Sequence, residues 1–294
     1  MRVTPRDVTL LENIARLRLA STAQLAALDG GSAQNVSRAL LALWENGYVE
    51  RPEAQAASRL LYEGSRPAIH GLTRKGAALL REHGLDVRRR LLDGIDKERG
   101  AGWRFVEHTV SVGEFMVRLE LALRGRDGVG ILERGEIVED APKSKRDRLV
   151  KMEATIRVGG TLRRNSVVPD ALFGLRFANN DQRYFMLEID RGEMPVERYK
   201  NAQRTYFAKK MLTYFEANRQ QRHVHDLGIE NFRVLTVTTT NERVERMLMA
   251  LDAMTNGRGS NIFLFTHQAA VMGSNNLLEL QWVSGKKGVV RLID

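Results

Sequence analysis

Residues 167–192 read VVPDALFGLRFANNDQRYFMLEIDRG, and this stretch decides the fold of the second half of the chain. Apolar residues alternate over 171–177 and again over 185–189, on either side of the polar sequence Asn179-Asn180-Asp181. This pattern predicts two antiparallel strands joined by a turn. Pairing about that turn places residues whose numbers sum to about 358 to 360 opposite each other, as Asp170 and Glu188 do. Opposed carboxylates repel and lose stability when desolvated, so a divalent metal ion is expected between them.

The composition excludes several classes of protein. The chain has 294 residues, a formal charge of +10 and a pI near 10.1, which favour a polyanionic partner such as double-stranded DNA. It contains no cysteine, so disulfides, thiolate zinc sites and cysteine nucleophiles are excluded. Neither a signal-peptide h-region nor an apolar run of membrane-spanning length is present, so a cytoplasmic location without a membrane segment is expected.

Residues 1–85 are predicted to form a winged helix-turn-helix DNA-binding domain. Thr4, Ser21, Ser32 and Thr73 are placed to cap four helices, and short segments at 48–51 and 59–62 are consistent with the two strands of a wing. The third helix of such a domain enters the major groove. Its outward side chains have types that read base edges or hold phosphates, and they are Gln34, Asn35, Ser37 and Arg38. The alternative is a small helical module with a solvated surface that mediates dimerisation.

Residues 86–102 are predicted to be a linker, because three arginines run together and glycines interrupt any periodicity. Residues 103–294 are predicted to form a second domain. Its expected elements are a helix at 104–124, strands at 130–138 and 153–158, the hairpin, a helix at 196–218, a strand at 232–238, a helix at 241–254, a strand at 261–265 and an irregular β-addition at 277–294. A basic segment before the second of these strands is expected to meet DNA phosphates and contains Lys143, Lys145, Arg146 and Arg148.

The order helix, strand, acidic hairpin, helix, strand resembles the core of PD-(D/E)xK nucleases. Pro169-Asp170 and Glu188-Ile189-Asp190 resemble the motif of that fold. The expected fold class is therefore α+β or α/β, a winged helix followed by a restriction-endonuclease-like domain with a mixed central sheet. Phosphodiester hydrolysis needs a hard cation that neutralises the phosphate and acidifies a water, and Mg²⁺ or Mn²⁺ is expected on Asp170 and Glu188, with Glu114 as a further ligand.

The third motif position departs from this pattern, because Asp190 stands where a lysine is usual. Two interpretations stay open. Either Asp190 is a further metal ligand and another residue supplies the cation, with Lys200 the best placed, or the site has lost catalysis.

With HTVSVGEF near the start of the second domain, VPDALFGL and YFMLEIDRGEMP, the chain resembles the replication-relaxation family, which includes MobC-type plasmid relaxases. The resemblance implies a metal-dependent nickase acting at an origin of transfer or replication on a plasmid or integrative element. By motif position it assigns the acids to Asp170, Glu188 and Asp190, the helical histidine to His108 and the helical lysine to Lys200. Expected partners are double-stranded origin DNA and accessory mobilisation or coupling proteins, and the oligomeric state, a homodimer included, stays open.

The sequence also allows three rival interpretations. His223-Val224-His225 matches the paired histidines of rolling-circle nucleases, but its neighbours indicate a polar loop. A catalytically inactive DNA-binding regulator of plasmid replication or transfer, built on the nuclease fold, is the main competitor, and the missing lysine favours it. A restriction or repair nuclease would make double-strand cuts or ignore the origin sequence.

Overall fold

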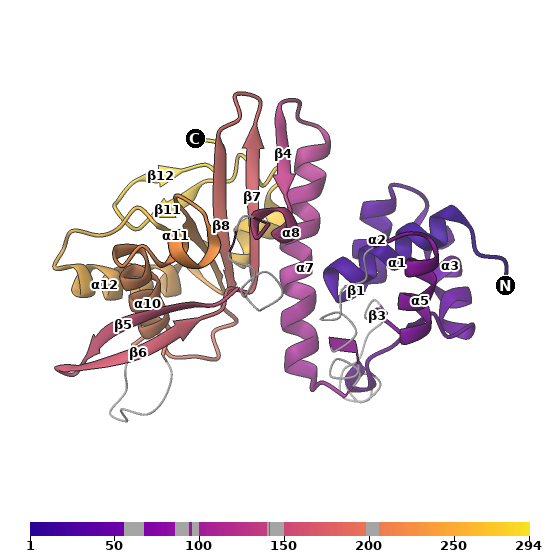
Figure 1. Ribbon diagram of the computed structural model, residues 1–294, viewed down its shortest axis with the longest axis horizontal. Helices are drawn as coiled ribbons and strands as arrows, with labels where there is room; N and C mark the ends of the chain where they lie inside the picture. The colour runs from indigo at the N-terminus through magenta and orange to yellow at the C-terminus, as the bar shows by residue number, and fades with distance from the viewer. Residues whose placement is uncertain (56–67, 86–93, 96–99, 140, 142–149, 198–205) are drawn as a thin grey trace. The chain divides into compact units, whose positions relative to one another are not determined.

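A computed structural model describes residues 1–55, 68–85, 94–95, 100–139, 141, 150–197 and 206–294 (Figure 1). The chain divides into two compact units, Met1–Leu121 (unit 1) and Ala122–Asp294 (unit 2).

Unit 1 begins with three helices, α1 (Pro5–Leu17), α2 (Thr22–Asp29) and α3 (Ala33–Glu45). The predicted caps of the first two are confirmed, because Thr4 and Ser21 each accept a backbone N–H three residues on while that residue's side chain bonds back. Ser32 precedes α3 as predicted but makes no side-chain capping bond. The buried faces of these helices supply most of the unit 1 core, which includes Leu10, Leu11, Ile14, Leu25, Val36, Leu40 and Leu43.

A three-stranded antiparallel sheet adjoins these helices, in the order β1 (Leu19–Ser21), β3 (Ile69–Leu72), β2 (Val49–Glu50). The strand predicted at 48–51 corresponds to β2, whereas the one predicted at 59–62 lies outside the described residues. Helix α5 (Arg74–Glu82) follows, and Thr73 caps it as predicted. Gly76 is required there, because a Cβ atom would lie 2.3 Å from the carbonyl oxygen of Tyr48.

Unit 1 extends beyond the 85 residues expected for the first domain, because most of helix α7 (Trp103–Arg124) belongs to it. Val117 of α7 is part of the unit 1 core, and the Gln24 side chain donates a hydrogen bond of 2.8 Å to the carbonyl of Val110. The sequence pattern marked α7 correctly but not the surface on which it packs.

Unit 2 contains a seven-stranded sheet, and the predicted mixed sheet is confirmed. Its strands in spatial order are β12 (Val289–Val290), β11 (Trp282–Ser284), β10 (Phe263–His267), β9 (Arg233–Thr238), β8 (Gln182–Ile189), β7 (Ala171–Phe177) and β4 (Val129–Leu132). Strands β8, β9 and β10 are parallel and the other pairs antiparallel. The strand predicted at 130–138 is too long, because Glu133 and Glu136 form a capping box that begins helix α8 (Arg134–Ile137).

The β7–β8 hairpin has the predicted register. Ala171 pairs with Leu187 and Phe173 with Phe185, so residues whose numbers sum to 358 lie opposite each other. The two phenylalanine rings stack with centroids 5.2 Å apart. In the turn, Asn180 adopts the left-handed conformation (φ 63°), which asparagine tolerates better than most residues. The register brings Asp170, which directly precedes β7, beside the end of β8.

Helices α10 (Phe207–Arg219), α11 (Arg222–Leu227), α12 (Asn241–Thr255) and α13 (Gln268–Gly273) complete unit 2. The predicted helix start at 196 is wrong: residues 196 and 197 are not helical, and the carbonyls of Pro195 and Val196 instead accept the amides of Phe207 and Ala208 at 2.9 Å. The expected polar loop at 223–225 is also wrong, because these residues form α11. Side chains of α10 and α12 share one core with Met186, Val234, Phe263 and Phe265 of the sheet.

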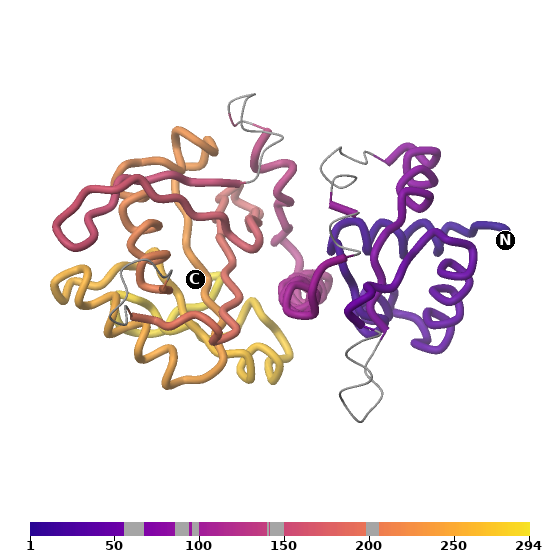
Figure 2. The backbone as a smooth tube through the Cα atoms, turned by 90° about the horizontal axis from the view of Figure 1, so that it is seen from below, coloured from indigo at the N-terminus to yellow at the C-terminus, as the bar shows by residue number. Residues whose placement is uncertain are grey.

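A separate two-stranded sheet, β5 (Met152–Val158) and β6 (Thr161–Val167), forms a hairpin that packs on α10. Strand β5 was predicted, but β6 was not. The tip of this β5–β6 hairpin projects from unit 2 in both views (Figures 1 and 2). None of the helices in the described residues is long and apolar enough to cross a membrane.

Candidate functional site

Polar side chains gather where the parallel strands β8 and β9 end. Glu188 of β8 is paired in register with Thr236 of β9, so both side chains lie on the same face of the sheet. Asp190 follows two residues later, and its amide continues the pairing by donating 2.8 Å to the carbonyl of Val237. The carboxyl ends of parallel strands are where open α/β sheets commonly bind ligands.

Glu188 is the most deeply buried acid of this group, with 2% of its surface exposed. Its two carboxylate oxygens are held by two side chains of α10. Tyr214 donates its hydroxyl to Oε1 at 2.5 Å, and the Lys210 ammonium pairs with Oε2. Lys210 and Tyr214 are four residues apart, so they project from the same side of the helix. The buried acid of the strand and the half-buried cation of the helix thus form one ion pair.

The protonation of this pair follows from its burial. Burial raises the pKa of Glu188 to about 7, and the charge of Asp170 adds to this effect while Lys210 opposes it. Burial lowers the pKa of Lys210, but the carboxylates of Glu188 and Asp170 outweigh it and raise that pKa above the usual value. Lys210 is therefore protonated at neutral pH. Together the two groups bind protons more tightly than a solvated pair would.

Tyr214 is placed to hold the carboxylate and not to attack a substrate. It is 1% exposed, and burial, the charge of Glu188 and the hydrogen bond to it raise its pKa well above 10. A phenol that is shielded from solvent and so reluctant to ionise is a poor nucleophile.

Asp170 lies close enough to Glu188 for its charge to act on that residue's pKa. Its amide donates to the carbonyl of Leu187 at 2.9 Å, and its Oδ2 accepts the amide of Ile189 at 2.8 Å. The side chain is half-buried. The predicted proximity of Asp170 and Glu188 is thus confirmed by the backbone contacts that fix Asp170 to β8.

Asp190 makes a buried ion pair with Arg243 of α12. The Arg243 Nε and Nη2 atoms lie 2.5 and 2.9 Å from the two carboxylate oxygens, and Thr238 donates its hydroxyl to Oδ2 at 2.5 Å. The side chains of Asp190 and Arg243 are only 5% and 7% exposed. Both oxygens of Asp190 are therefore used inside the protein, where the ion pair joins β8 to α12.

The carboxylates at the end of β8 meet the minimum that Mg²⁺ or Mn²⁺ requires. Mg²⁺ is commonly held by one or two carboxylates together with waters and substrate phosphates, and Asp170 and Glu188 meet this minimum. The Thr236 hydroxyl, opposite Glu188, is buried and has no hydrogen-bond partner among the described residues, so it can bind a water of such a cluster. No group of three or more acidic or histidine side chains suited to a metal occurs among the described residues. The two-carboxylate set fits, and Asp190 does not add to it.

Comparison with known families gives a match to the replication-relaxation family over residues 11–225. The chain belongs to the replication-relaxation family. This membership, expected from the sequence, links the chain to the replication or mobilisation of plasmids and so to DNA. No curated protein and no solved structure matches the chain. The family match includes Asp170, Glu188, Asp190, Lys210 and Tyr214, whereas Arg243 lies beyond it.

The other predicted residues of this replication-relaxation protein are placed as follows. Glu114 and His108 lie on α7 within unit 1, where the Glu114 carboxylate binds Gln24 at 3.2 Å and Arg118 at 2.8 Å. The predicted DNA-reading side chains of α3 are all exposed: Gln34, Asn35, Ser37 and Arg38. Five predicted basic residues lie outside the described residues: Lys143, Lys145, Arg146, Arg148 and Lys200.

The sequence interpretation missed three residues of this site, Lys210, Tyr214 and Arg243. Lys210 and Tyr214 fall in the helix predicted at 196–218, but that prediction gave neither of them a role. The lysine–tyrosine spacing of four residues, after a hairpin with a buried glutamate, was the available signal. Arg243 gave none, because only the packing of α12 shows where its guanidinium lies.

The histidine pair of this replication-relaxation protein is not a metal site. His223 is buried, and its Nε2 lies 3.1 Å from the carbonyl of Glu230, whereas His225 is exposed. Burial lowers the pKa of His223. One histidine therefore lies in the protein interior and the other faces solvent.

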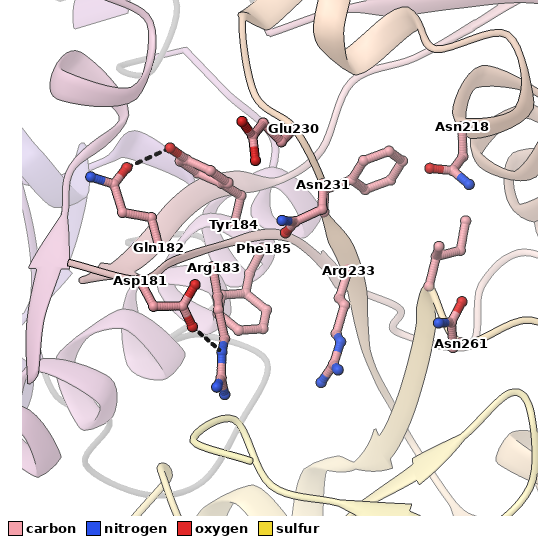
Figure 3. A pocket seen from close by; sticks show the side chains of 12 residues that line it. Asp181, Gln182, Arg183, Tyr184, Phe185, Asn218, Glu230, Asn231, Arg233 and Asn261 are labelled. Atoms are coloured by element: carbon pink, nitrogen blue, oxygen red, sulfur yellow. Dashed lines mark hydrogen bonds and ion pairs between the residues drawn. The ribbon is translucent and has the colours of Figure 1, made fainter. Parts of the chain in front are cut away.

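A cavity of about 410 Å³ lies at the opposite ends of the same strands (Figure 3). Residues 182–185 and Arg233, which begin β8 and β9, contribute to its lining. Figure 3 shows the side chains of Arg183 and Arg233 extending in the same direction. The carboxylates lie at the other ends of β8 and β9, so this cavity is separate from them.

Proposed function

We propose that the chain is a site-specific DNA nickase of a plasmid or integrative element, which cleaves one strand at an origin of transfer or replication. In this proposal unit 1 is a winged helix that recognises the site through α3, and unit 2 is a PD-(D/E)xK-like nuclease. The observation that carries it is the Lys210–Glu188–Asp170 cluster. A lysine and two acids meet at the end of the hairpin although the usual lysine position is occupied by Asp190.

Asp170 and Glu188 would hold Mg²⁺ or Mn²⁺. A bound metal ion would neutralise the scissile phosphate and acidify a water. Lys210, which stays protonated, would stabilise negative charge on the phosphate through its ammonium. Tyr214 would orient Glu188 through its hydroxyl, and the Asp190–Arg243 ion pair would keep the end of β8 in place.

The second candidate is an inactive DNA-binding regulator of replication or transfer. Two observations favour it: both oxygens of Glu188 already have protein partners, and both oxygens of Asp190 are bound to Arg243. The Lys210 ammonium on Oε2 would compete with a metal ion for Glu188, and Oδ2 of Asp190 already accepts from both Arg243 and Thr238. The regulator would keep the same DNA affinity and make no cut.

Relaxation of supercoiled plasmid carrying the element's own origin separates the two candidates. With Mg²⁺ or Mn²⁺ the nickase converts this plasmid, and not one lacking the origin, to the open circle. Asp170→Asn, Glu188→Gln and Lys210→Met should abolish conversion, whereas Asp181→Asn, in the exposed turn of the same hairpin, should not. Origin binding without conversion by the wild type would reject the nickase and support the regulator. Double-strand cuts would instead identify a restriction or repair nuclease.

A further inference from the structure

The β5–β6 hairpin carries a strongly basic surface that the proposed catalytic site does not use. Residues 151–167 contain four basic side chains, Lys151, Arg157, Arg163 and Arg164, and a single acid, Glu153. The acid is shared, because it pairs with Lys151 at 2.7 Å and with Arg164 at 3.1 Å. A net positive charge therefore remains on this two-stranded ribbon.

The register shows why this charge faces solvent. Arg157 pairs with Leu162 and Thr155 with Arg164, so these four side chains lie on one face. The alternate residues Met152, Ala154 and Ile156 are buried in the unit 2 core. The sequence of β6, TLRRNSV, is exposed at its first four residues although strands usually bury one face. Burial thus accounts for one side of β5, and no described element covers the outer face. Arg163 pairs with Ile156 and so lies on the opposite face, but it is exposed near the tip.

The hairpin is held firmly at its base. The Asn165 side chain donates to the Thr213 hydroxyl of α10 at 2.7 Å, and the Gln220 amide bonds both to the backbone N–H of Thr155 and to its carbonyl, at 3.1 and 2.9 Å. Helix α10 also carries Lys210 and Tyr214. A ligand on the ribbon would therefore bind a surface anchored to the helix of the candidate site.

The tip combines charge with an exposed apolar side chain. Leu162 is 60% exposed, and the Arg164 side chain is 79% exposed. Arg157 donates to the carbonyl of Gly160 in the turn, and neither Arg157 nor Arg163 forms an ion pair within the described part of the chain. Arginines beside an exposed apolar residue at the end of a ribbon are the groups with which proteins bind phosphates and contact a DNA groove.

We propose that the β5–β6 hairpin is a DNA-binding ribbon, in which Arg157, Arg163 and Arg164 bind backbone phosphates of a duplex and Leu162 contacts its groove. Seven-residue strands extend about 23 Å. This is about two thirds of one turn of B-DNA, so the ribbon can reach several phosphates. The inference rests on the proposed function, since it assumes a DNA substrate, and it adds a second contact to the one proposed for α3.

The test compares two variants of equal charge. Arg157, Arg163 and Arg164 are changed to glutamine in one, and the control changes three exposed arginines elsewhere in unit 2, namely Arg176, Arg246 and Arg291. Fluorescence anisotropy with an origin duplex gives the affinity as a function of salt. Loss of three phosphate contacts should reduce the slope of log affinity against log salt concentration (the salt slope) by about 2.7 in magnitude. If the affinities of variant and wild type become equal near 1 M salt, the variant should bind about a hundred-fold more weakly at 0.15 M salt.

Leu162→Ser forms a second arm, and it should weaken binding without changing the salt slope, because it removes no charge. Melting curves confirm that the variants are folded. Equal losses in the hairpin and control triples would overturn the proposal, since net charge alone would explain them, and so would an unchanged slope in the hairpin triple. Failure of the wild type to bind any duplex would instead reject the proposed function itself.

Discussion

Replacing Arg243 with methionine would leave the Asp190 carboxylate charged and buried in unit 2. The guanidinium now makes two contacts with that carboxylate, at 2.5 and 2.9 Å, and a third with the carbonyl of Met194. Thr238 would still donate to Oδ2, but none of the described residues would supply another cation in contact. Removing one partner of a buried ion pair costs about 3–5 kcal/mol. For a unit of this size each kcal/mol lowers Tm by about 2–4 °C, so the expected fall is about 6–20 °C.

The measurement has to report on unit 2 alone, because two units need not unfold together. The chain has three tryptophans, and Trp282 is the one in unit 2, where it is fully buried. In a background with Trp44→Phe and Trp103→Phe, its fluorescence follows the denaturation of unit 2. Arg243→Met and Asp190→Asn should each destabilise this transition, and the double variant should cost clearly less than their sum.

Additive losses, or a cost below about 1 kcal/mol for Arg243→Met, would refute the assignment of Asp190 to a structural ion pair. The same set of variants tests whether Asp190 binds metal. If Mg²⁺ raises the Tm of the wild type, Asp190→Asn should keep most of that increase, whereas Asp170→Asn should lose it. Loss of the increase in Asp190→Asn, with unit 2 still folded, would return Asp190 to the metal site.

Three further predictions concern unit 1 and the division of labour. Burial, helped by the charge of Arg51, lowers the pKa of His70 to about 4. Because this folded pKa lies below the unfolded value of about 6.5, the stability that neutral His70 provides is complete above pH 6.5 and falls by about 3 kcal/mol as the pH drops from 6.5 through 4. His70→Gln should flatten this pH dependence in chemical denaturation. Arg38→Ala should weaken origin binding by about 1–3 kcal/mol in anisotropy, whereas Glu188→Gln should leave it unchanged, and equal weakening would contradict separate roles for the two units. Gly76→Ala should destabilise unit 1 by about 1–3 kcal/mol in thermal melts, because the new Cβ would meet the Tyr48 carbonyl, and an unchanged Tm would show that α5 moves freely.

Local signals predicted the local features of the fold. The capping residues Thr4 and Ser21 lie within three residues of the groups they bind, and the β7–β8 register follows from one turn and one alternation. The start of α10 was mispredicted because Pro195 is a good first residue of a helix. Its carbonyl instead caps a helix that begins at Phe207, a contact across a gap in sequence that periodicity cannot report.

The candidate site was predictable only in part. The register of a hairpin that turns at Asn179-Asn180-Asp181 pairs Asp170 with Glu188, so the sequence alone places these two acids together. Lys210 and Arg243 reach the site from helices whose rotation depends on packing against the sheet. Strand β6 escaped prediction for a related reason, since its outer residues bury nothing and show no alternation. The sequence patterns did not predict which face of a helix or strand packs against the rest of the protein.

The sheet of unit 2 ends on both sides in short strands. As described, its outermost members are β4, with four residues, and β12, with two. A free strand edge is a template on which another chain can add its own strand, and brevity is one way in which natural proteins prevent this. Neither edge offers enough unpaired backbone to continue the sheet into a neighbouring molecule. Any self-association along this seven-stranded sheet would therefore have to be specified by side chains, and its strength would be open to tuning by point mutation without disturbing the sheet.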